Sequence, residues 1–401
     1  MKRKRSREGY YYNENRKARR ERPQGAGRKF VWGVFDVVML VVSIVAALAL
    51  VLALMSRVIN PEHFILPAFA GLFYPVVYLV NLFCALWWVV RWDRWFWLSA
   101  AMLFLGGGSI GLFYRSDVGT KPVTVDRERS DVVVATYNVM NFSDAGKPEA
   151  ATSFDRVADW VNKNGIQLLC LQEAHFSSEH DFKAFRDQLK KLSYGHYVNG
   201  NASEAGEYSG SGYALFSAWP IVRRGVASVD KQMVYSVWAD VKIGRDTVRV
   251  FNNHLQSTGI TLEDRSTTLH PAIALDDEAG SKLMRIVRKM AGNYRQRVEQ
   301  AKEVAKAVKE SPHPVVVCGD FNDTPVSYVY RVVRKGGNLQ DAFVEKGRGA
   351  EHTFKGLYKL FRIDYIMTDK EAFEVKDYAS HNESMSDHKP VVVRLGRNDE
   401  K

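Results

Sequence analysis

The sequence predicts an α/β fold, a sandwich of β-sheets covered by helices over residues 131–397, preceded by three membrane-spanning helices within residues 30–114. Two observations lead to this prediction. Three long apolar runs occupy the N-terminal part of the chain, whereas short runs rich in valine, isoleucine and aromatic residues recur after residue 131. Helical patterns separate several of the later runs without strict alternation, which indicates helices packed on mixed sheets.

The basic charge of the chain is concentrated at its N-terminus. The formal net charge is +11, of which residues 1–30 carry +9, while residues 31–120 are neutral. Residues 121–401 therefore hold a net charge of +2, and charge alone does not indicate that this part binds nucleic acid. We expect residues 1–29 to form a disordered basic tail, because they are polar and highly charged.

The three cysteines, Cys84, Cys170 and Cys318, lie in apolar segments. Their spacing matches neither a disulfide framework nor a metal site. We expect three buried free thiols that pack as small apolar side chains.

The apolar runs cover approximately Phe30–Met55, Phe64–Val90 and Trp95–Tyr114. Each is long enough to cross about 30 Å of hydrocarbon. Asp36 lies near the start of the first run, where its carboxylate can reach the interface between membrane and water. A cleaved signal peptide is excluded, because the first apolar region is too long and two more follow. Buried core helices are the alternative interpretation.

The distribution of lysine and arginine predicts the orientation of these helices. The basic tail stays in the cytoplasm, and three crossings then place everything after Tyr114 outside it. The protein is therefore expected in the membrane, in a bacterium the inner membrane, with residues 115–130 as a linker to an extracytoplasmic domain. The lipid bilayer is a predicted partner, and the sequence indicates no protein partner.

Strands and helices follow the linker. Eight strands are predicted from their β-branched and aromatic content, namely Val132–Val139, Ile166–Leu171, Tyr213–Ile221, Val234–Ile243, Thr247–His254, Val315–Cys318, Ile363–Met367 and Pro390–Leu395. Four helices are predicted from their periodicity, namely Ser153–Asn164, Ser178–Leu192, Ser281–Glu310 and Val326–Lys335. Residues 257–280 form a long polar insertion, for which a lid, a partner site and a disordered loop remain open.

Polar residues lie at the ends of several strands or beside them. They are Asn138, Gln172, Glu173, His254, Asp320, Asn322, Asp364, Asp387 and His388. Individually each has a structural interpretation, such as an Asx turn or a buried Asp–His hydrogen bond. Buried charges are costly unless they are paired or bound to metal, so we expect the group to form one site. Its oxygen donors suit Mg²⁺, with Mn²⁺ as the alternative, whereas two histidines and no cysteine make zinc a poorer fit.

The segments that contain these residues carry a family resemblance. They are ATYNVMNF, LLCLQEAH, GYALFSAWPI, FNNHL, VVCGDFND, RIDYI and SDHKPV, in this order over about residues 130–397. The set resembles the endonuclease/exonuclease/phosphatase superfamily, in particular its deoxyribonuclease-like and sphingomyelinase-like members. The resemblance implies a metal-dependent phosphoric ester hydrolase with a four-layered α/β sandwich and a site at one edge of two packed sheets. The apolar runs lie outside the resemblance.

The resemblance also implies which residues bind the metal and activate water. Glu173 would be the principal Mg²⁺ ligand, with Asn138 and Asp387 near the metal. Asp320 would orient or deprotonate the attacking water, and Asn322 would hold a phosphate oxygen.

The remaining implied roles concern the phosphoryl group and the fold. His388 would stabilise charge on the phosphoryl group, and Asp364 would fix the tautomer and orientation of that histidine. His254 would contact the phosphate or help the leaving group. Arg297 and Gln300 resemble a recurrent helix motif of the family and are expected to support the fold.

The sequence leaves more than one class of substrate open. Phe251–Leu255 departs from the motif of the abasic-site repair branch, so cytoplasmic DNA repair is disfavoured. A nuclease acting outside the cytoplasm is the first hypothesis, although the near-neutral domain charge weakens it unless a local patch such as Arg223 and Arg224 suffices. A phosphodiesterase or phosphatase of phospholipid head groups is the alternative. An inactive, membrane-tethered binding module is the second alternative, and the intact polar set speaks against it.

Overall fold

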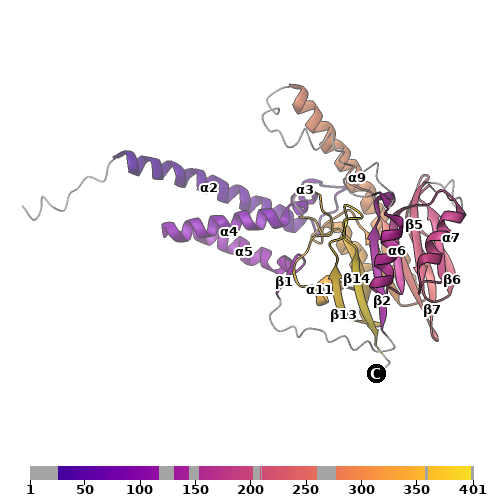
Figure 1. The fold of residues 1–401 in the computed structure, drawn as a ribbon. Helices are drawn as coiled ribbons and strands as arrows, with labels where there is room; N and C mark the ends of the chain where they lie inside the picture. The colour runs from indigo at the N-terminus through magenta and orange to yellow at the C-terminus, as the bar shows by residue number, and fades with distance from the viewer. Residues whose placement is uncertain are drawn as a thin grey trace, which may run out of the picture.

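The computed structural model describes residues 26–116, 131–143, 153–201, 208, 210–259, 277–356 and 360–398. It consists of a bundle of apolar helices joined to an α/β sandwich (Figure 1). The predicted basic tail lies outside the described residues except for residues 26–29, which begin the first helix. Most of the predicted linker and of the 257–280 insertion also lies outside the described part of the chain.

Two six-stranded sheets form the centre of the sandwich, in the orders β13-β14-β2-β3-β5-β4 and β10-β12-β9-β8-β7-β6. Each sheet contains one parallel pair, β2–β3 or β8–β9, and its other neighbours are antiparallel. The first sheet comprises β2 (Val132–Asn138), β3 (Leu168–His175), β4 (Tyr194–Asn199), β5 (Ser211–Ser217), β13 (Phe373–Ser380) and β14 (Val391–Arg397). The second comprises β6 (Ile221–Asp230), β7 (Met233–Ile243), β8 (Asp246–His254), β9 (Val315–Asp320), β10 (Leu339–Asp341) and β12 (Asp364–Asp369).

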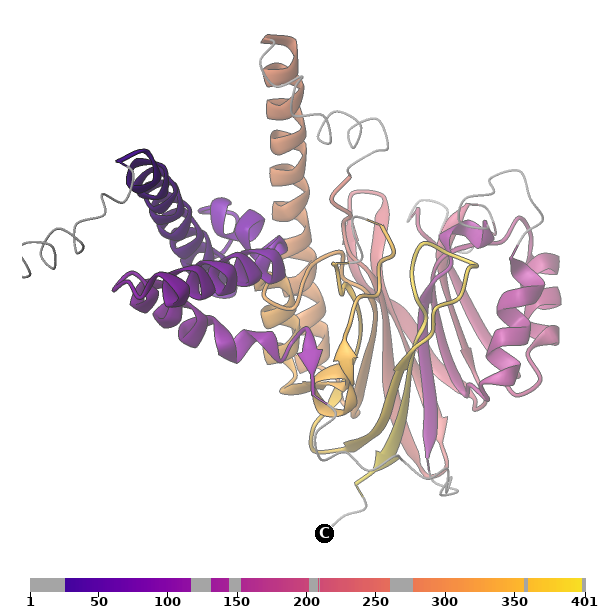
Figure 2. The same cartoon turned by 60° about the vertical axis from the view of Figure 1, so that its left-hand side comes forward.

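Side-chain alternation along the strands produces four layers. Val134 and Val316 point between the two sheets and belong to one apolar core. Ala135 points outward and packs with α6 and α7, whereas Val317 points outward and packs with α9 and α10. The helices of the sandwich are η2 (Met140–Phe142), α6 (Phe154–Lys163), α7 (Glu179–Gln188), α9 (Asp277–Lys309), α10 (Tyr328–Gly336) and α11 (Ala342–Lys346). The four-layered sandwich predicted from the resemblance is confirmed (Figure 2).

The strands that the sequence did not predict include all four edges of the two sheets, β4, β6, β10 and β13. Polar residues interrupt these edge strands, such as Arg223 and Arg224 in β6 and Gln340 and Asp341 in β10, so they lack the apolar run by which a central strand is recognised. The predicted strand Tyr213–Ile221 is wrong at its end, because β5 stops at Ser217 and β6 starts at Ile221 after a turn that contains Pro220. The three cysteines are buried and free, as predicted.

The apolar helices are α2 (Ala26–Met55), α3 (Leu66–Leu72), α4 (Tyr74–Arg91) and α5 (Phe96–Ile110). The second predicted run is divided into α3 and α4, because Phe73 leaves helical geometry just before Pro75. Two helices, Gly33–Met55 and Tyr74–Arg91, are long and apolar enough to cross a membrane. The 15 residues of α5 rise by roughly 22 Å, which is less than the hydrocarbon thickness.

Polar contacts connect the helices of the bundle. Arg91 Nη2 and Asp36 Oδ2 form an ion pair at 2.6 Å, which joins the start of α2 to the end of α4. Trp88 Nε1 donates a hydrogen bond to Ser43 Oγ at 2.9 Å. A Cβ at Gly106 would lie 3.0 Å from the Tyr78 ring, so the glycine permits the close packing of α4 and α5.

The bundle is joined to the sandwich by backbone and side-chain hydrogen bonds. The short strand β1 (Tyr114–Arg115) pairs with β11 (Gly349–Ala350). Arg362 is fully buried at the same junction, where its Nε donates to Leu112 O at 3.0 Å. Both Nη atoms of Arg362 donate to the Asp341 carboxylate, at 3.1 and 2.7 Å. Arg362 thus connects the end of the bundle to the strand that begins at Asp364.

We expect Arg362→Met to lower the free energy of unfolding by about 3–5 kcal/mol, because the buried Asp341 carboxylate would lose its cation. The measurement is chemical denaturation of the full chain in non-ionic detergent. The matched control is Arg397→Met, whose ion pair with Asp246 is partly exposed and should contribute less than about 1 kcal/mol. Equal effects of the two substitutions would contradict a structural role for the buried pair.

Candidate active site

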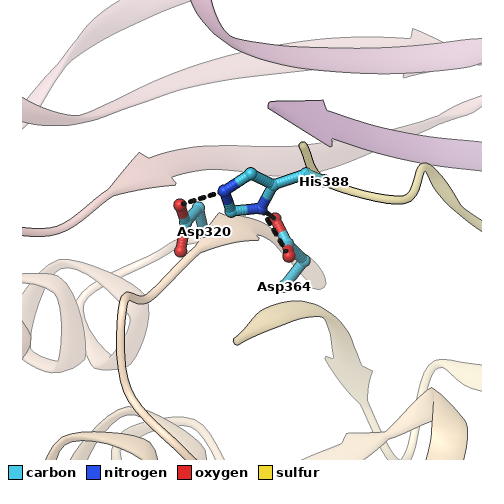
Figure 3. Close-up of side chains that lie close together, drawn as sticks. All are labelled: Asp320, Asp364 and His388. Carbon is cyan, nitrogen blue, oxygen red and sulfur yellow. Dashed lines mark hydrogen bonds and ion pairs between the residues drawn. The ribbon is translucent and has the colours of Figure 1, made fainter. Parts of the chain in front are cut away.

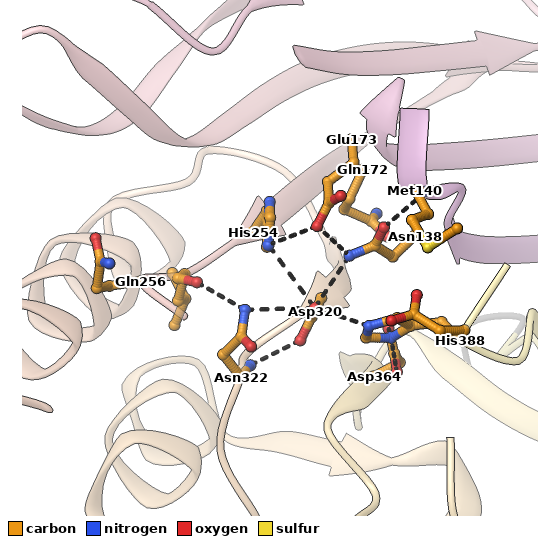
Figure 4. Close-up of polar contacts among 12 residues, drawn as sticks. Asn138, Met140, Gln172, Glu173, His254, Gln256, Asp320, Asn322, Asp364 and His388 are labelled. Atoms are coloured by element: carbon orange, nitrogen blue, oxygen red, sulfur yellow. Dashed lines mark hydrogen bonds and ion pairs between the residues drawn. The ribbon is translucent and has the colours of Figure 1, made fainter. Parts of the chain in front are cut away.

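The two parallel strand pairs bring polar residues to one edge of the sandwich. Asn138 lies opposite Gln172 at the ends of β2 and β3, and His254 lies opposite Asp320 at the ends of β8 and β9. Because parallel strands end at the same edge of a sheet, these side chains collect there without a long loop (Figure 4). The antiparallel strand β12 begins at this edge, with Asp364 opposite Asp320.

An irregularity in β3 separates its two terminal polar residues. Glu173 has a φ of 50°, and the pairing of β3 with β5 shifts register between Leu171 and Ala174. Such a bulge re-aims side chains, and here it directs Glu173 into the site. Gln172 instead points between the sheets, where its Nε2 donates to Asn252 Oδ1 at 2.6 Å and so links the two sheets beneath the site.

Asn138 joins the two carboxylates that lie on different sheets. Its Nδ2 donates to Glu173 Oε1 at 2.9 Å and to Asp320 Oδ2 at 3.2 Å. Its Oδ1 accepts a hydrogen bond from Met140 N at 3.1 Å. In this orientation Asn138 holds the carboxylates in place and presents its nitrogen to them.

The turn after β9 fixes Asp320. Gly319 has a φ of 133°, and a Cβ there would lie 2.0 Å from Asn253 O, so only glycine lets β9 approach β8 this closely. Asn322, with a φ of 52°, donates its backbone N–H to Asp320 Oδ1 at 2.7 Å. Its side-chain Nδ2 donates to Leu255 O at 3.0 Å, so in this structure Asn322 positions the loop.

Burial, together with the charge of Asp364, raises the pKa of Asp320 to about 6, although the charges of His388 and His254 oppose the shift. A carboxylate with this pKa is ionised for much of the time near neutral pH and can still accept a proton there. Asp320 therefore has the protonation behaviour of a general base.

His388 lies between two aspartates (Figure 3). Its Nδ1 is 2.9 Å from Asp364 Oδ2, and its Nε2 is 3.7 Å from Asp320 Oδ2. Burial lowers the pKa of His388, but the charges of Asp364 and Asp320 outweigh burial and raise the pKa to about 10. The ring is therefore a cation near neutral pH.

His254 lies at the other side of the carboxylate pair. Its Nε2 is 3.5 Å from Glu173 Oε1 and 3.8 Å from Asp320 Oδ2. The side chain is partly exposed, so it can reach a ligand that enters the site.

Asp387 is placed differently from the other predicted ligands. It is half-buried, and its carboxylate accepts a hydrogen bond from Ser386 Oγ at 3.4 Å. Among the described residues it makes no hydrogen bond to Glu173 or Asn138. Asp387 therefore lies beside the carboxylate cluster, on the loop directly before His388.

Several residues of the site were missed by the sequence analysis. Ser386 Oγ donates to Asn138 O at 2.7 Å and accepts from His388 N at 3.1 Å, which joins two loops of the site. Thr353 Oγ1 accepts from Asp364 N at 3.0 Å, and the Phe354 ring lies 5.1 Å from the His388 ring. Ser386 lies inside a recognised motif and could have been found from it. Thr353 and Phe354 follow a loop with no distinguishing pattern.

Arg297 and Gln300 lie behind the site on α9. Arg297 Nε donates to Gln256 O at 2.6 Å, and Arg297 Nη1 lies 3.6 Å from Asp323 Oδ2. Gln300 Oε1 accepts from Gln256 N at 2.8 Å. Both are buried and position the loops after β8 and β9, which agrees with their expected role in the fold.

A pocket of about 250 Å³ opens beside the carboxylate cluster. Glu173 and His254 form one wall, and Tyr235 and Met233 contribute to another. This volume is enough for part of a ligand, such as one sugar or one base, so the pocket is suited to a group next to the reacting atoms.

The donor atoms of the site fit a hard divalent cation. Glu173 and Asp320 offer carboxylate oxygens from the two facing sheets, and Asn138 would add its Oδ1 after its amide turns. Oxygen ligands are those that Mg²⁺ and Mn²⁺ prefer. Asp320, Asp364 and His388 also place one donor atom each within 4.8 Å of one another. Both His388 nitrogens face carboxylates, however, and a ring protonated on both nitrogens cannot bind a metal. The oxygen cluster around Glu173 is therefore the better cation site.

Known proteins resemble the chain in both of its parts. A family model described as the Endonuclease/Exonuclease/phosphatase family matches residues 135–388, and a domain of unknown function (DUF8431) matches residues 36–113. No curated protein matches the sequence.

Solved structures match the sandwich at low identity. An endonuclease/exonuclease/phosphatase from Beutenbergia cavernae is 18% identical, with 67% of this chain and 72% of that chain covered and a TM-score of 0.49. A family protein from Bacteroides thetaiotaomicron is 20% identical, with coverages of 67% and 98% and a TM-score of 0.48. The human Nocturnin catalytic domain is 18% identical, with coverages of 68% and 96% and a TM-score of 0.46.

We expect Asp364→Asn to lower phosphodiester turnover at least about 10²-fold, because the amide removes the charge that keeps His388 protonated and oriented. The measurement is the initial rate with bis(p-nitrophenyl) phosphate. Asp369→Asn, the same substitution at the other end of β12, is the control and should leave the rate unchanged. Similar rates for both variants would refute the role of the Asp364–His388 pair.

Proposed function

The chain belongs to the endonuclease/exonuclease/phosphatase family, and from this membership we propose that it is a membrane-anchored, divalent-cation-dependent enzyme that cleaves phosphodiester bonds. Members of this family hydrolyse phosphoric esters, and the chain is a hydrolase of this class. One observation supports the finer proposal above all. Strand ends from both sheets bring Asn138, Glu173, His254 and Asp320 together with the Asp364–His388 pair.

His388 stabilises the phosphoryl group in this proposal. As a cation with one nitrogen held by Asp364, it offers its Nε2–H to a non-bridging phosphate oxygen. Charge-assisted hydrogen bonds of this kind are strongest where charge develops in the transition state. Asp364 keeps the ring fixed and charged, so it acts as a positioning residue.

Asp320 takes the proton of the attacking water. Its Oδ1 is held by Asn322 N, and its Oδ2 faces Asn138 and the two histidines. A water within hydrogen-bond reach of Asp320 can be aimed at phosphorus and lose its proton to this carboxylate. Asn322 supports this geometry, and it can contact a phosphate oxygen only after its amide leaves Leu255 O.

We propose that Glu173 holds a Mg²⁺ ion, with Asn138 and Asp387 beside it and Mn²⁺ as the alternative ion. When bound, the cation polarises the phosphoryl oxygen and stabilises the leaving oxygen. Asn138 keeps Glu173 and Asp320 close together and would turn its amide to offer Oδ1. His254 lies between the carboxylates and the pocket, where it can contact the phosphate or protonate the leaving group.

Membrane anchoring is part of the proposal. The apolar outer surface of α2 and α4 and their length support crossing, and the Asp36–Arg91 pair lies at the end of the bundle nearest the basic tail. The positive-inside rule then places residues 1–29 in the cytoplasm. We propose α5 as a third crossing, for which local thinning of the bilayer compensates its short length. The domain at 131–397 then lies outside the cytoplasm, at the inner membrane of a bacterial cell.

Nucleic acid is the first proposed substrate. A pocket of about 250 Å³ with a tyrosine in its wall can take one base or one sugar while the strand continues outside. The exposed Arg223 and Arg224 on β6 provide a local basic patch. A phospholipid head group is the second candidate, because the hydrogen bonds between the bundle and the sandwich hold the site at a fixed position relative to the bilayer.

We expect Glu173→Ala and His388→Ala each to lower turnover by at least about 10²-fold, because the first removes the principal metal ligand and the second the cation that faces the phosphate. The free energy of unfolding should change little in Glu173→Ala, whereas His388→Ala should also lower it, because the buried Asp320 and Asp364 lose the cation between them. Glu179→Ala and His180→Ala, the same substitutions at exposed positions of α7, serve as controls. Unchanged rates in both site variants would remove the support for this site.

We expect the full chain to hydrolyse plasmid DNA or RNA with Mg²⁺ and to lose all turnover in EDTA, because the cation would polarise the phosphoryl oxygen and stabilise the leaving oxygen. The same preparation is assayed on sphingomyelin and phosphoinositide vesicles. Lipid turnover without nucleic-acid cleavage would refute the nuclease hypothesis and support a lipid phosphoesterase. No turnover on any substrate, with Mg²⁺ binding demonstrated, would favour the inactive binding module.

A further inference from the structure

A cavity of about 820 Å³ lies where the bundle meets the sandwich. Its apolar walls come from the ends of α2 and α5, including Leu54, Val58 and Leu105. Its other side is the helix α10 of the sandwich. None of the proposed catalytic or metal-binding residues lines this junction cavity, so it is a separate site.

Four cations line the junction cavity, and no carboxylate does. They are Arg57, Arg331, Arg334 and Lys335. Within the described part of the chain, none of the four forms an ion pair with an aspartate or glutamate. Their neutral hydrogen bonds leave the charge uncompensated: Arg57 Nη1 donates to Ser109 Oγ at 3.2 Å, and Arg334 Nε donates to Leu339 O at 3.2 Å.

Among the described residues, one acidic side chain is bonded to the cavity wall, and it already has a cation. Tyr330, which lines the cavity, donates its hydroxyl to Asp341 at 2.7 Å. That carboxylate is bound by both Nη atoms of Arg362. Four cations without a counter-charge in one cavity favour an anionic ligand, and arginine forks match phosphate oxygens particularly well.

The position of the cavity identifies the kind of anion. Leu54 is one residue before the end of α2, and Leu105 lies in the last turns of α5, so the cavity is level with the ends of both helices. Val58 and Leu105 are more than half exposed on the side of the bundle. An apolar surface that leads into a basic cavity matches a molecule with acyl chains and an anionic head.

We propose that the junction cavity binds the phosphate of an anionic phospholipid, with its acyl chains along α2 and α5. The proposal rests on the proposed membrane anchoring and is independent of the reaction at the catalytic site. Arg57 extends from the bundle and Arg331 from α10, and Arg331 Nη1 also donates to Arg57 O at 3.3 Å. A lipid phosphate between these cations would therefore strengthen the contact between the bundle and the sandwich.

The test measures lipid binding to the full chain in non-ionic detergent, with His388→Ala and EDTA present so that no lipid is hydrolysed. The probes are dioctanoyl-phosphatidylglycerol, dioctanoyl-phosphatidylcholine and inorganic phosphate. We expect phosphatidylglycerol to bind at least about tenfold more tightly than the zwitterionic lipid or free phosphate, since each basic residue near a lipid surface contributes about 1 kcal/mol.

Substitutions locate the binding. We expect Arg331→Gln with Lys335→Gln to weaken phosphatidylglycerol binding at least about tenfold, and Arg331→Lys with Lys335→Arg to preserve it. Lys190→Gln with Lys191→Gln removes the same charge from an exposed loop and should have no effect. Lys335→Gln alone changes an exposed position and should weaken phosphatidylglycerol binding severalfold. This single variant replaces the double variant in the test if the double variant does not fold.

Three results would overturn the proposal. Equal affinity for both lipids, or unchanged binding in the folded Gln variants, would show that the cations do not hold a lipid phosphate. Displacement of the lipid by equimolar inorganic phosphate would identify a site for a soluble anion. Because hydrolysis is blocked, none of these results depends on whether the catalytic proposal is correct.

Discussion

The site depends on one constraint, the parallel pairing of β2 with β3 and of β8 with β9. Each sheet is otherwise antiparallel, so its strand ends alternate between the two edges. The parallel pairs break this alternation and bring neighbouring C-terminal ends to one edge, with Asn138 and Glu173 on one sheet and His254 and Asp320 on the other. The antiparallel strand β12 adds Asp364 at its first residue, because its register places Asp364 opposite Asp320.

Several carboxylates are buried close together, and the other residues of the site compensate their mutual repulsion. Asp320 and Asp364 are almost completely buried, and the charge of Asp364 raises the cost of charge on Asp320. His388 lies between them as a cation, and Asn138 donates to both Asp320 and Glu173. Removing the histidine would leave two buried carboxylates without that cation, so the residue proposed to bind phosphate also stabilises the empty site.

The sequence predicted the central strands and the members of the site but not the edges or the local geometry. Central strands such as β9 are apolar on both faces, whereas in the edge strands β6 and β13 charged residues such as Arg223, Arg224 and Asp377 interrupt the apolar ones, so that the strands resemble loops. The motifs included both Gln172 and Glu173, and strand alternation alone could not predict the bulge that separates them. The orientation of the Asn138 amide and the contact of Phe354 with His388 depend on loops that have no periodic pattern.

The hydrogen bonds of Arg362 fix the position of the site relative to the helix bundle. Arg362 bonds Leu112 at the end of the bundle and Asp341 before α11, and two residues later the chain supplies Asp364 to the site. The guanidinium is fully buried, so movement of the bundle relative to the sandwich would break its hydrogen bonds without replacement by water. A flexible tether would let the domain turn freely, whereas this junction fixes the direction of the catalytic edge relative to the apolar helices. With the proposed membrane anchoring, these hydrogen bonds would also set the direction of the catalytic edge relative to the bilayer.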